Sequence, residues 1–173
     1  MNVWFLTGTF GNIAPIKRKC RIPIGRAVFF PVLVKEDSLA EDTDLKTDED
    51  LVNRSRDATN ELLFISASID DIKIENLEKY RVQSEVFDLK FPRDNVYGVK
   101  PGLTRSVCDG FWLFIKPLEA GEHYIHFKGE TAVVNNTIRT FLMHNKVYSQ
   151  IQDHLERNLT FKLDVSYEIM ICK

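Results

Sequence analysis

The sequence predicts an all-β fold, a β-sandwich that could take a jelly-roll arrangement, with two helical insertions. Short apolar or alternating segments recur along the chain and are separated by turn residues. The supply of 12 Phe, 5 Tyr and 2 Trp suits packed sheets. Strands and helices do not alternate regularly, which disfavours a doubly wound α/β sheet. With 173 residues, the chain has the length of a single domain, residues 1–173.

Three strands are predicted in the N-terminal part of the chain. Residues 3–7 form the first, and residues 20–24 and 27–34 form the next two, separated by Gly25. Pro31 lies inside the third segment. Because proline has no backbone N–H for the ladder, it predicts either an edge position or a β-bulge there.

The composition changes at residues 35–50, which hold eight acidic residues and two lysines. This density of charge predicts that residues 36–50 form an exposed loop. Thr47 and Asp50 have the spacing of a helix-capping box, with Asp in place of the usual Glu. We therefore expect a short helix over residues 48–60.

Two hairpins are predicted in the middle of the chain. Residues 66–74 form a tight one around Asp70–Asp71, which follows a strand at residues 62–69. Residues 109–129 form the second, because two apolar or alternating runs flank a turn-rich Leu-Glu-Ala-Gly segment.

The C-terminal part of the chain combines a helix and a strand. Apolar residues recur at helical spacing and predict a helix over residues 140–156. Residues 159–171 then alternate as a long strand that turns Phe161, Leu163, Val165 and Tyr167 to one side.

The global composition argues against several kinds of partner. The formal net charge of −2 gives no reason to expect nucleic acid. No apolar run approaches the roughly 20 residues of a membrane span. The first residues lack the basic start and the length of a signal peptide. The three cysteines, Cys20, Cys108 and Cys172, allow at most one disulfide, and buried free thiols are the expected alternative.

No arrangement of catalytic residues stands out, and we predict no cofactor and no metal. His123 and His126 are three apart on a predicted strand and would point to opposite faces. A calcium site at Asp42, Asp44 and Asp48 lacks the glycine and distal glutamate of an EF-hand. The basic cluster at residues 17–21 is best explained as an edge strand that resists aggregation.

Four residues are the candidates for a binding site. Arg81 and Arg105 each lie where a predicted strand meets a loop, and Asp109 could pair with either of them. A structural ion pair is the simpler explanation for these charges. Trp112 is the fourth candidate, since an exposed Trp112 or Tyr124 on a concave sheet face would favour a glycan ligand.

The sequence resembles a family of uncharacterised, often exported microbial β-sandwich proteins. The resemblance rests on segments that cover most of the chain: VWFLTGTFG, CRIPIGRAVFFPVL, SASIDDIKI, YRVQSEVFDLKFP and CDGFWLFIKPLEAGEHYIHFKG. It implies an extracytoplasmic location and no particular activity. Relatives carry a second cysteine at the place where this chain has residues 35–38. Because this chain lacks that cysteine, a disulfide from Cys20 to that place is not available.

The function expected from these observations is a non-catalytic module that binds a protein or a glycan. Two alternatives stay open. A sugar-active or hydrolytic jelly-roll enzyme would need two carboxylates, or a histidine and a carboxylate, in one pocket. A structural or assembly subunit would need a large apolar surface patch.

Overall fold

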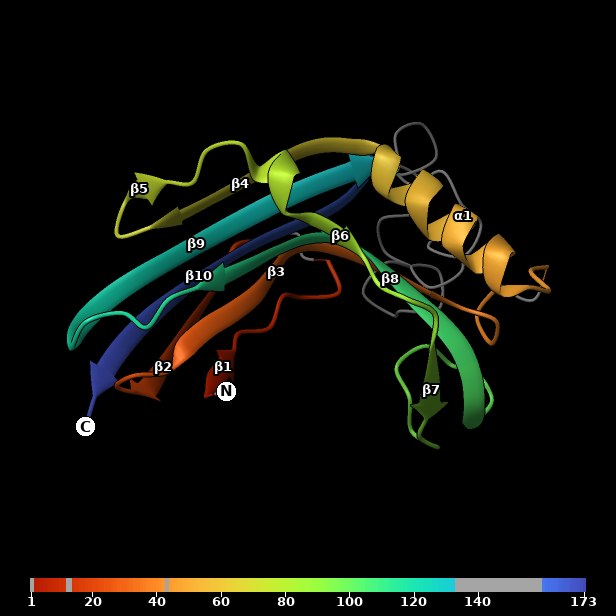
Figure 1. Cartoon of the computed structure of the whole chain (residues 1–173), viewed down its shortest axis with the longest axis horizontal. Helices are drawn as coiled ribbons and strands as arrows, with labels where there is room; N and C mark the ends of the chain where they lie inside the picture. The colour runs from red at the N-terminus through yellow and green to blue at the C-terminus, as the bar shows by residue number, and fades with distance from the viewer. Residues whose placement is uncertain (1, 12–13, 43, 133–159) are drawn as a thin grey trace.

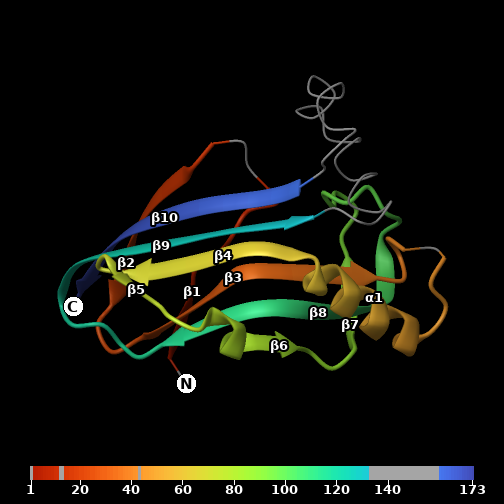
Figure 2. The same ribbon diagram turned by 90° about the horizontal axis from the view of Figure 1, so that it is seen from above.

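The protein is described by a computed structural model over residues 2–11, 14–42, 44–132 and 160–173. Two five-stranded sheets pack on each other, and Figure 2 shows them as two layers, one with β4, β9 and β10 and one with β3, β6 and β8. This arrangement agrees with the expected all-β sandwich. The predicted helix over residues 140–156 lies outside the described residues.

Each sheet is built around long central strands. Sheet 1 contains β1 (Val3–Phe5), β3 (Ala27–Ser38), β8 (Gly102–Ile115), β6 (Arg81–Gln83) and β7 (Phe87–Phe91). Both β6 and β7 pair with the edge of β8 that β3 leaves free. Sheet 2 has the order β2 (Ile16–Pro23), β10 (Thr160–Cys172), β9 (Gly121–Ala132), β4 (Leu62–Ile69) and β5 (Ile72–Lys73).

The core lies between the sheets and is formed by alternate residues of their strands. Phe30 of β3 stacks on Phe127 of β9 with ring centroids 5.1 Å apart, and both side chains are fully buried. Strand β10 buries Leu163, Val165 and Tyr167, as their alternation predicted. Burial of such large side chains is the main stabilising contribution to folding.

Strand β3 contains an irregularity at Pro31. The register of β3 against β8 shifts between Pro31 and Leu33, which confirms the predicted bulge. The pairing of β1 with the other edge of β3 ends at Phe29, so it does not reach Pro31, and the alternative of an edge position fits there as well. Gly110 of β8 lies opposite this bulge. A Cβ atom there would lie 2.4 Å from the carbonyl oxygen of Leu33, so the close approach of the two strands requires glycine.

The connection between β8 and β9 overturns one expectation. Residues 109–129 do not form a hairpin, because β8 belongs to sheet 1 and β9 to sheet 2. Strand β9 pairs with β10 and β4, while β8 pairs with β3, β6 and β7. Each strand therefore has other partners along both edges, and the segment between them crosses from one layer to the other (Figure 2).

The predicted hairpin at residues 66–74 is present as β4 and β5. Its two turn residues, Asp70 and Asp71, have φ angles of 50° and 64°. Two consecutive positive φ values are typical of the tight turn that suits the twist of paired strands.

The only α-helix in the described part of the chain is α1, Asp48–Asn60, which has the predicted bounds. The Thr47 hydroxyl accepts a hydrogen bond from the Asp50 N–H, and the Asp50 carboxylate accepts one from the Thr47 N–H. This capping box satisfies N–H groups that the first turn leaves free. Figure 1 shows α1 beside one half of β8, and a short 3-10 helix (Leu77–Tyr80) precedes β6.

The acidic segment before α1 differs from the prediction of an exposed loop. Strand β3 continues to Ser38, and the side chains of Asp37 and Asp42 are buried. Cations explain this burial, since Lys35 lies 2.8 Å from Asp37 and Arg54 lies 3.1 Å from Asp42. Arg54 comes from α1, whereas Lys35 meets Asp37 because residues two apart in a strand lie on one face.

Among the described residues, no helix is long and apolar enough to cross a membrane.

Candidate functional site

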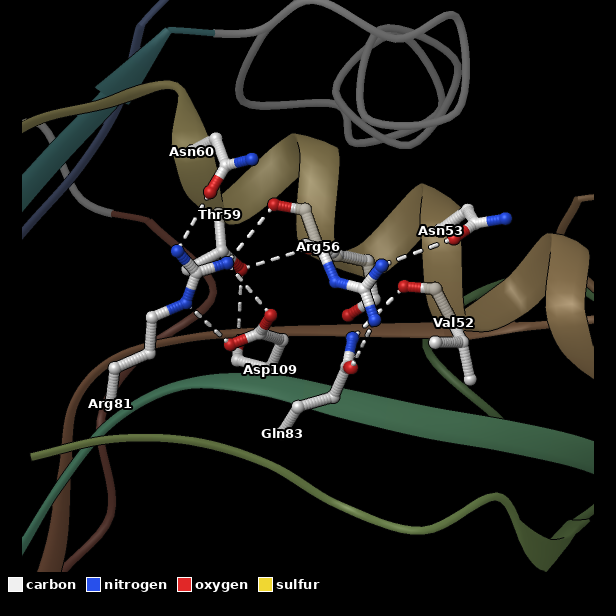
Figure 3. Close-up of polar contacts among 9 residues, drawn as sticks. Val52, Asn53, Arg56, Thr59, Asn60, Arg81, Gln83 and Asp109 are labelled. Atoms are coloured by element: carbon white, nitrogen blue, oxygen red, sulfur yellow. Dashed lines mark hydrogen bonds and ion pairs between the residues drawn. The ribbon is translucent and has the colours of Figure 1, made fainter.

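Two of the predicted site residues, Arg81 and Asp109, form a two-pronged ion pair. The Arg81 Nε donates to Asp109 Oδ1 at 2.9 Å and the Nη2 donates to Oδ2 at 2.8 Å (Figure 3). The Asp109 side chain is only 2 % exposed, and that of Arg81 is 29 % exposed. The hydrogen bonds to Asp109 raise the pKa of Arg81 above its ordinary value.

This ion pair holds α1 against sheet 1. Arg81 also donates to the side-chain oxygen of Asn60 at 2.7 Å and to the backbone carbonyl of Arg56 at 3.1 Å. Gln83, the next residue of β6 on the same face, donates to the backbone carbonyl of Val52 at 2.9 Å (Figure 3). These contacts satisfy helix carbonyls and the buried charge at once, which assigns Arg81 and Asp109 a structural role.

Arg105 does not pair with Asp109. It donates to Asp48 at the start of α1 and to Asp88 of β7, at 2.8 Å in each case. Residues 105 and 109 share a face of β8, but four residues of extended strand separate them by about 13 Å. Arg105 therefore makes a second, more exposed link between α1 and sheet 1.

Trp112 lies on the opposite face of β8 and is not part of this network. Its ring stacks on Phe29 of β3, with centroids 5.3 Å apart and planes 2° from parallel. Phe5 of β1 and Phe114 of β8 contact Phe29 at 5.7 Å and 6.1 Å. We call these four rings, Phe5, Phe29, Trp112 and Phe114, the aromatic face. Two of them are largely exposed, Phe5 by 68 % and Phe114 by 52 %.

A pair of carboxyl groups, those of Glu36 and Glu41, lies on the same side of sheet 1 as the aromatic face, near the C-terminal end of β3. Glu36 accepts a hydrogen bond from Ser106, and Glu41 accepts one from Ser38 at 2.7 Å. Burial, together with the negative charge of Glu36, raises the pKa of Glu41 to about 8. Glu41 is therefore protonated at neutral pH. Sequence reasoning missed this pair because it placed Glu36 and Glu41 in an exposed loop.

Cys108 lies beside this pair and is a free thiol, like the other two cysteines. Burial, with the nearby carboxylate of Glu36, raises its pKa to about 12. A thiol with so high a pKa is a weak nucleophile at neutral pH.

The two central histidines are directed to different places, as their spacing predicted. His123 lies 2.7 Å from Asp70 and 3.0 Å from the carbonyl oxygen of Glu119. Burial lowers the pKa of His123, but these two acceptors outweigh it and the net shift is upward. His126 lies 2.8 Å from Asp164 on the outer face of sheet 2. No group of three His, Cys, Asp or Glu residues within the described ranges could hold a metal ion.

A groove of about 800 Å³ runs along the end of sheet 2. We call it the sheet-2 groove, and its polar lining comes from four elements: Lys19 and Arg21 of β2, Glu168 of β10, Glu122, His123 and Tyr124 of β9, and Asp70 and Asp71 of the β4–β5 turn. Lys19 and Glu168 pair across neighbouring strands at 2.5 Å. The groove was not predicted, apart from Tyr124, because its residues come from distant parts of the chain.

No protein-family model matches this chain, and no curated protein matches it in sequence. The features that can indicate a function are therefore the aromatic face, the carboxyl pair and the sheet-2 groove.

Proposed function

We propose that this protein is a non-catalytic interaction module that binds a protein partner through the aromatic face. The single observation that carries the proposal is the exposure of Phe5 and Phe114 within a contiguous group of four aromatic rings. Large apolar side chains scattered singly on a surface need no explanation, but a contiguous patch usually marks an interaction site.

The composition of the aromatic face favours a protein partner. The centres of protein–protein interfaces are rich in aromatic residues and poor in charged ones, and a few such residues supply most of the binding energy. The four rings come from β1, β3 and β8, which hydrogen-bond to each other, so the sheet holds them in place. A rigid surface loses little conformational entropy when it binds.

The mutual packing of the rings makes a sugar a poorer fit for this face. Trp112 and Phe29 are stacked in parallel, so each covers one face of the other. A sugar ring needs an aromatic ring whose face is open, whereas apolar side chains of a protein can pack between ring edges.

The predicted charged residues support a role without catalysis. Arg81, Asp109 and Arg105 all fasten α1 to sheet 1, so their charges are used in folding. A hydrolytic activity, a jelly-roll arrangement, export and membership of the uncharacterised family remain predictions from the sequence.

A photo-reactive amino acid placed at Phe5 or Phe114 tests the proposal in extracts of the native host. We expect one discrete cross-linked protein at these positions. The same group placed at Leu103 or Ile72, which are 72 % and 74 % exposed, should give none, because neither residue belongs to the aromatic face.

The cross-linked protein must then bind when it is purified. The double variant Phe5→Ser/Phe114→Ser should weaken its binding by at least about 10-fold, or 1.4 kcal/mol, while Leu103→Ser leaves it unchanged. Equal cross-linking at all four positions, or equal affinity of the double variant, would contradict the proposal.

A further inference from the structure

The sheet-2 groove holds several polar side chains that the fold does not use. Three charged side chains make no hydrogen bond or ion pair with any other described residue: Arg21, Glu122 and Asp71. The hydroxyl of Tyr124 has no hydrogen-bond partner among the described residues either. By contrast, the charged residues around α1 are joined in pairs. The unused donors and acceptors of the groove are thus gathered in one hollow.

We propose that the sheet-2 groove binds an uncharged saccharide. The carboxylates of Glu122 and Asp71, which make no hydrogen bond to other described residues, can accept hydrogen bonds from hydroxyl groups, and the Arg21 guanidinium can donate to hydroxyl or ring oxygens. A hydroxyl group both donates and accepts. A polyhydroxyl ligand can therefore satisfy all three side chains, which a ligand with acceptors only or donors only cannot do.

The mixture of charges in the groove favours a ligand without net charge. Lys19 and Glu168 neutralise each other at 2.5 Å, and Asp70 lies 2.7 Å from His123. Arg21 faces a lining that also holds Glu122 and Asp71. An anionic ligand would be repelled by these carboxylates, and a cationic one by Arg21 and Lys19. This mixture of signs also disfavours nucleic acid, which requires a basic surface.

Tyr124 supplies the apolar contact that sugar binding needs. Its side chain is half-buried and lines the groove, and its ring is tilted by 44° against the ring of His126 at 6.4 Å. This leaves Tyr124 without the parallel stacking that covers Phe29 and Trp112 in the aromatic face. The C–H-rich face of a sugar ring can pack on such a ring.

The wall beside Tyr124 is rigid before any ligand arrives. Asp70 accepts a hydrogen bond from the backbone N–H of Tyr124 at 2.8 Å through one oxygen, and its other oxygen lies 2.7 Å from His123. A preorganised wall lowers the entropy cost of binding. The volume of the sheet-2 groove, about 800 Å³, falls within the range of small-ligand sites.

The test uses the full chain and a panel of short, neutral oligosaccharides of glucose, xylose, mannose, galactose and N-acetylglucosamine, with titration calorimetry as the readout. We expect at least one to bind with a Kd between about 10 μM and 1 mM. Tyr124→Ala and Glu122→Gln should each weaken that binding by at least about 10-fold.

Two controls make the test specific. Tyr80→Ala removes an exposed tyrosine from outside the groove, and Phe114→Ser alters the aromatic face, so both should bind the sugar as the wild type does. Glu122 is exposed, so Glu122→Gln should fold normally even if Tyr124→Ala does not. The Phe114→Ser control also separates this inference from the proposed protein-binding function, which uses the other sheet.

Three results would overturn the inference. The first is no binding of any neutral oligosaccharide at about 10 mM, well above the expected Kd. The second is binding that Tyr124→Ala and Glu122→Gln leave unchanged. The third is preferential binding of an anionic polysaccharide such as heparin or polygalacturonate that salt abolishes, since this would show recognition by charge.

Discussion

Beyond the bulge at Pro31, the acidic residues on the two faces of β3 and β8 lie in opposite environments, one with cations in contact and one without. On the face toward α1, Asp109 is bound by Arg81, and Lys35 lies 2.8 Å from Asp37. The latter contact is an ion pair without hydrogen-bond geometry, since neither oxygen of Asp37 has a hydrogen-bond partner. On the other face, neither Glu36 nor Glu41 forms an ion pair within the described residues, and Glu41 keeps its proton to about pH 8.

The difference shows that burial alone does not decide whether a carboxyl group is ionised. Glu36 and Asp37 are adjacent in sequence, but successive side chains of a strand point to opposite faces. Where the cation is in contact, the charge is compensated, and Arg81, which binds Asp109, also holds α1. Where it is not, desolvation and a second carboxylate favour the neutral form.

Removing the cation from the α1 side should have the largest effect. Arg81→Met leaves Asp109 buried and uncompensated, and we expect the free energy of unfolding to fall by about 3–5 kcal/mol. Urea denaturation measures this change.

The double variant Arg81→Met/Asp109→Asn is the matched control, because it removes the stranded charge as well. It should recover part of the lost stability. If Arg81→Met alone is as stable as the wild type, the ion pair does not hold α1 in the way described.

Removing the titratable group on the opposite side should change the pH dependence of stability. The pKa of Glu41 rises from an ordinary 4.5 to about 8 on folding, so the folded state binds the proton more tightly. Its contribution is therefore fully present below about pH 4.5 and is lost as the pH rises toward 8. The slope within this window can reach about 1.4 kcal/mol per pH unit.

Glu41→Gln should remove that slope, because the amide stays neutral at every pH. Urea denaturation at several values between pH 5 and pH 8 should show that the free energy of unfolding of the variant rises relative to that of the wild type as the pH increases. A constant difference across this range would mean that folding does not raise the pKa of Glu41. Asp88→Asn, on an exposed carboxylate, provides the comparison.

The smallest effect should come from Arg105, which makes the exposed link to α1. Its partners Asp48 and Asp88 are 52 % and 58 % exposed, so water replaces the lost contacts. Arg105→Ala should leave the melting temperature within about 2 °C of the wild type in calorimetry. A loss as large as that of Arg81→Met would show that exposure does not separate the two arginines.

Local features were predicted well because neighbouring residues determine them. The capping box of Thr47 and Asp50 gave the start of α1, and Asp70–Asp71 gave the β4–β5 turn. The candidate site was predicted less well. Arg81 and Asp109 do come together, but Trp112 lies on the other face and Arg105 has other partners.

Features that depend on distant partners could not be predicted from a single sequence. The apolar pattern of residues 109–129 is the same whether β8 and β9 pair or lie in different sheets. The buried acid at Asp42 looks solvated until Arg54 of α1 is placed beside it. Likewise, the sheet-2 groove joins Arg21 and Asp71 from opposite edges of its sheet, β2 and the β4–β5 turn.

The sequence by itself determined the strand-rich class, the helix over residues 48–60 and the inward side of β10, because periodicity and capping act over a few residues. The tertiary structure decided which strands share a sheet, which acids meet a cation and which aromatic rings remain exposed. These outcomes depend on contacts between residues far apart in the chain. Several pairings can satisfy the same local pattern, and only the packing of the whole core selects among them.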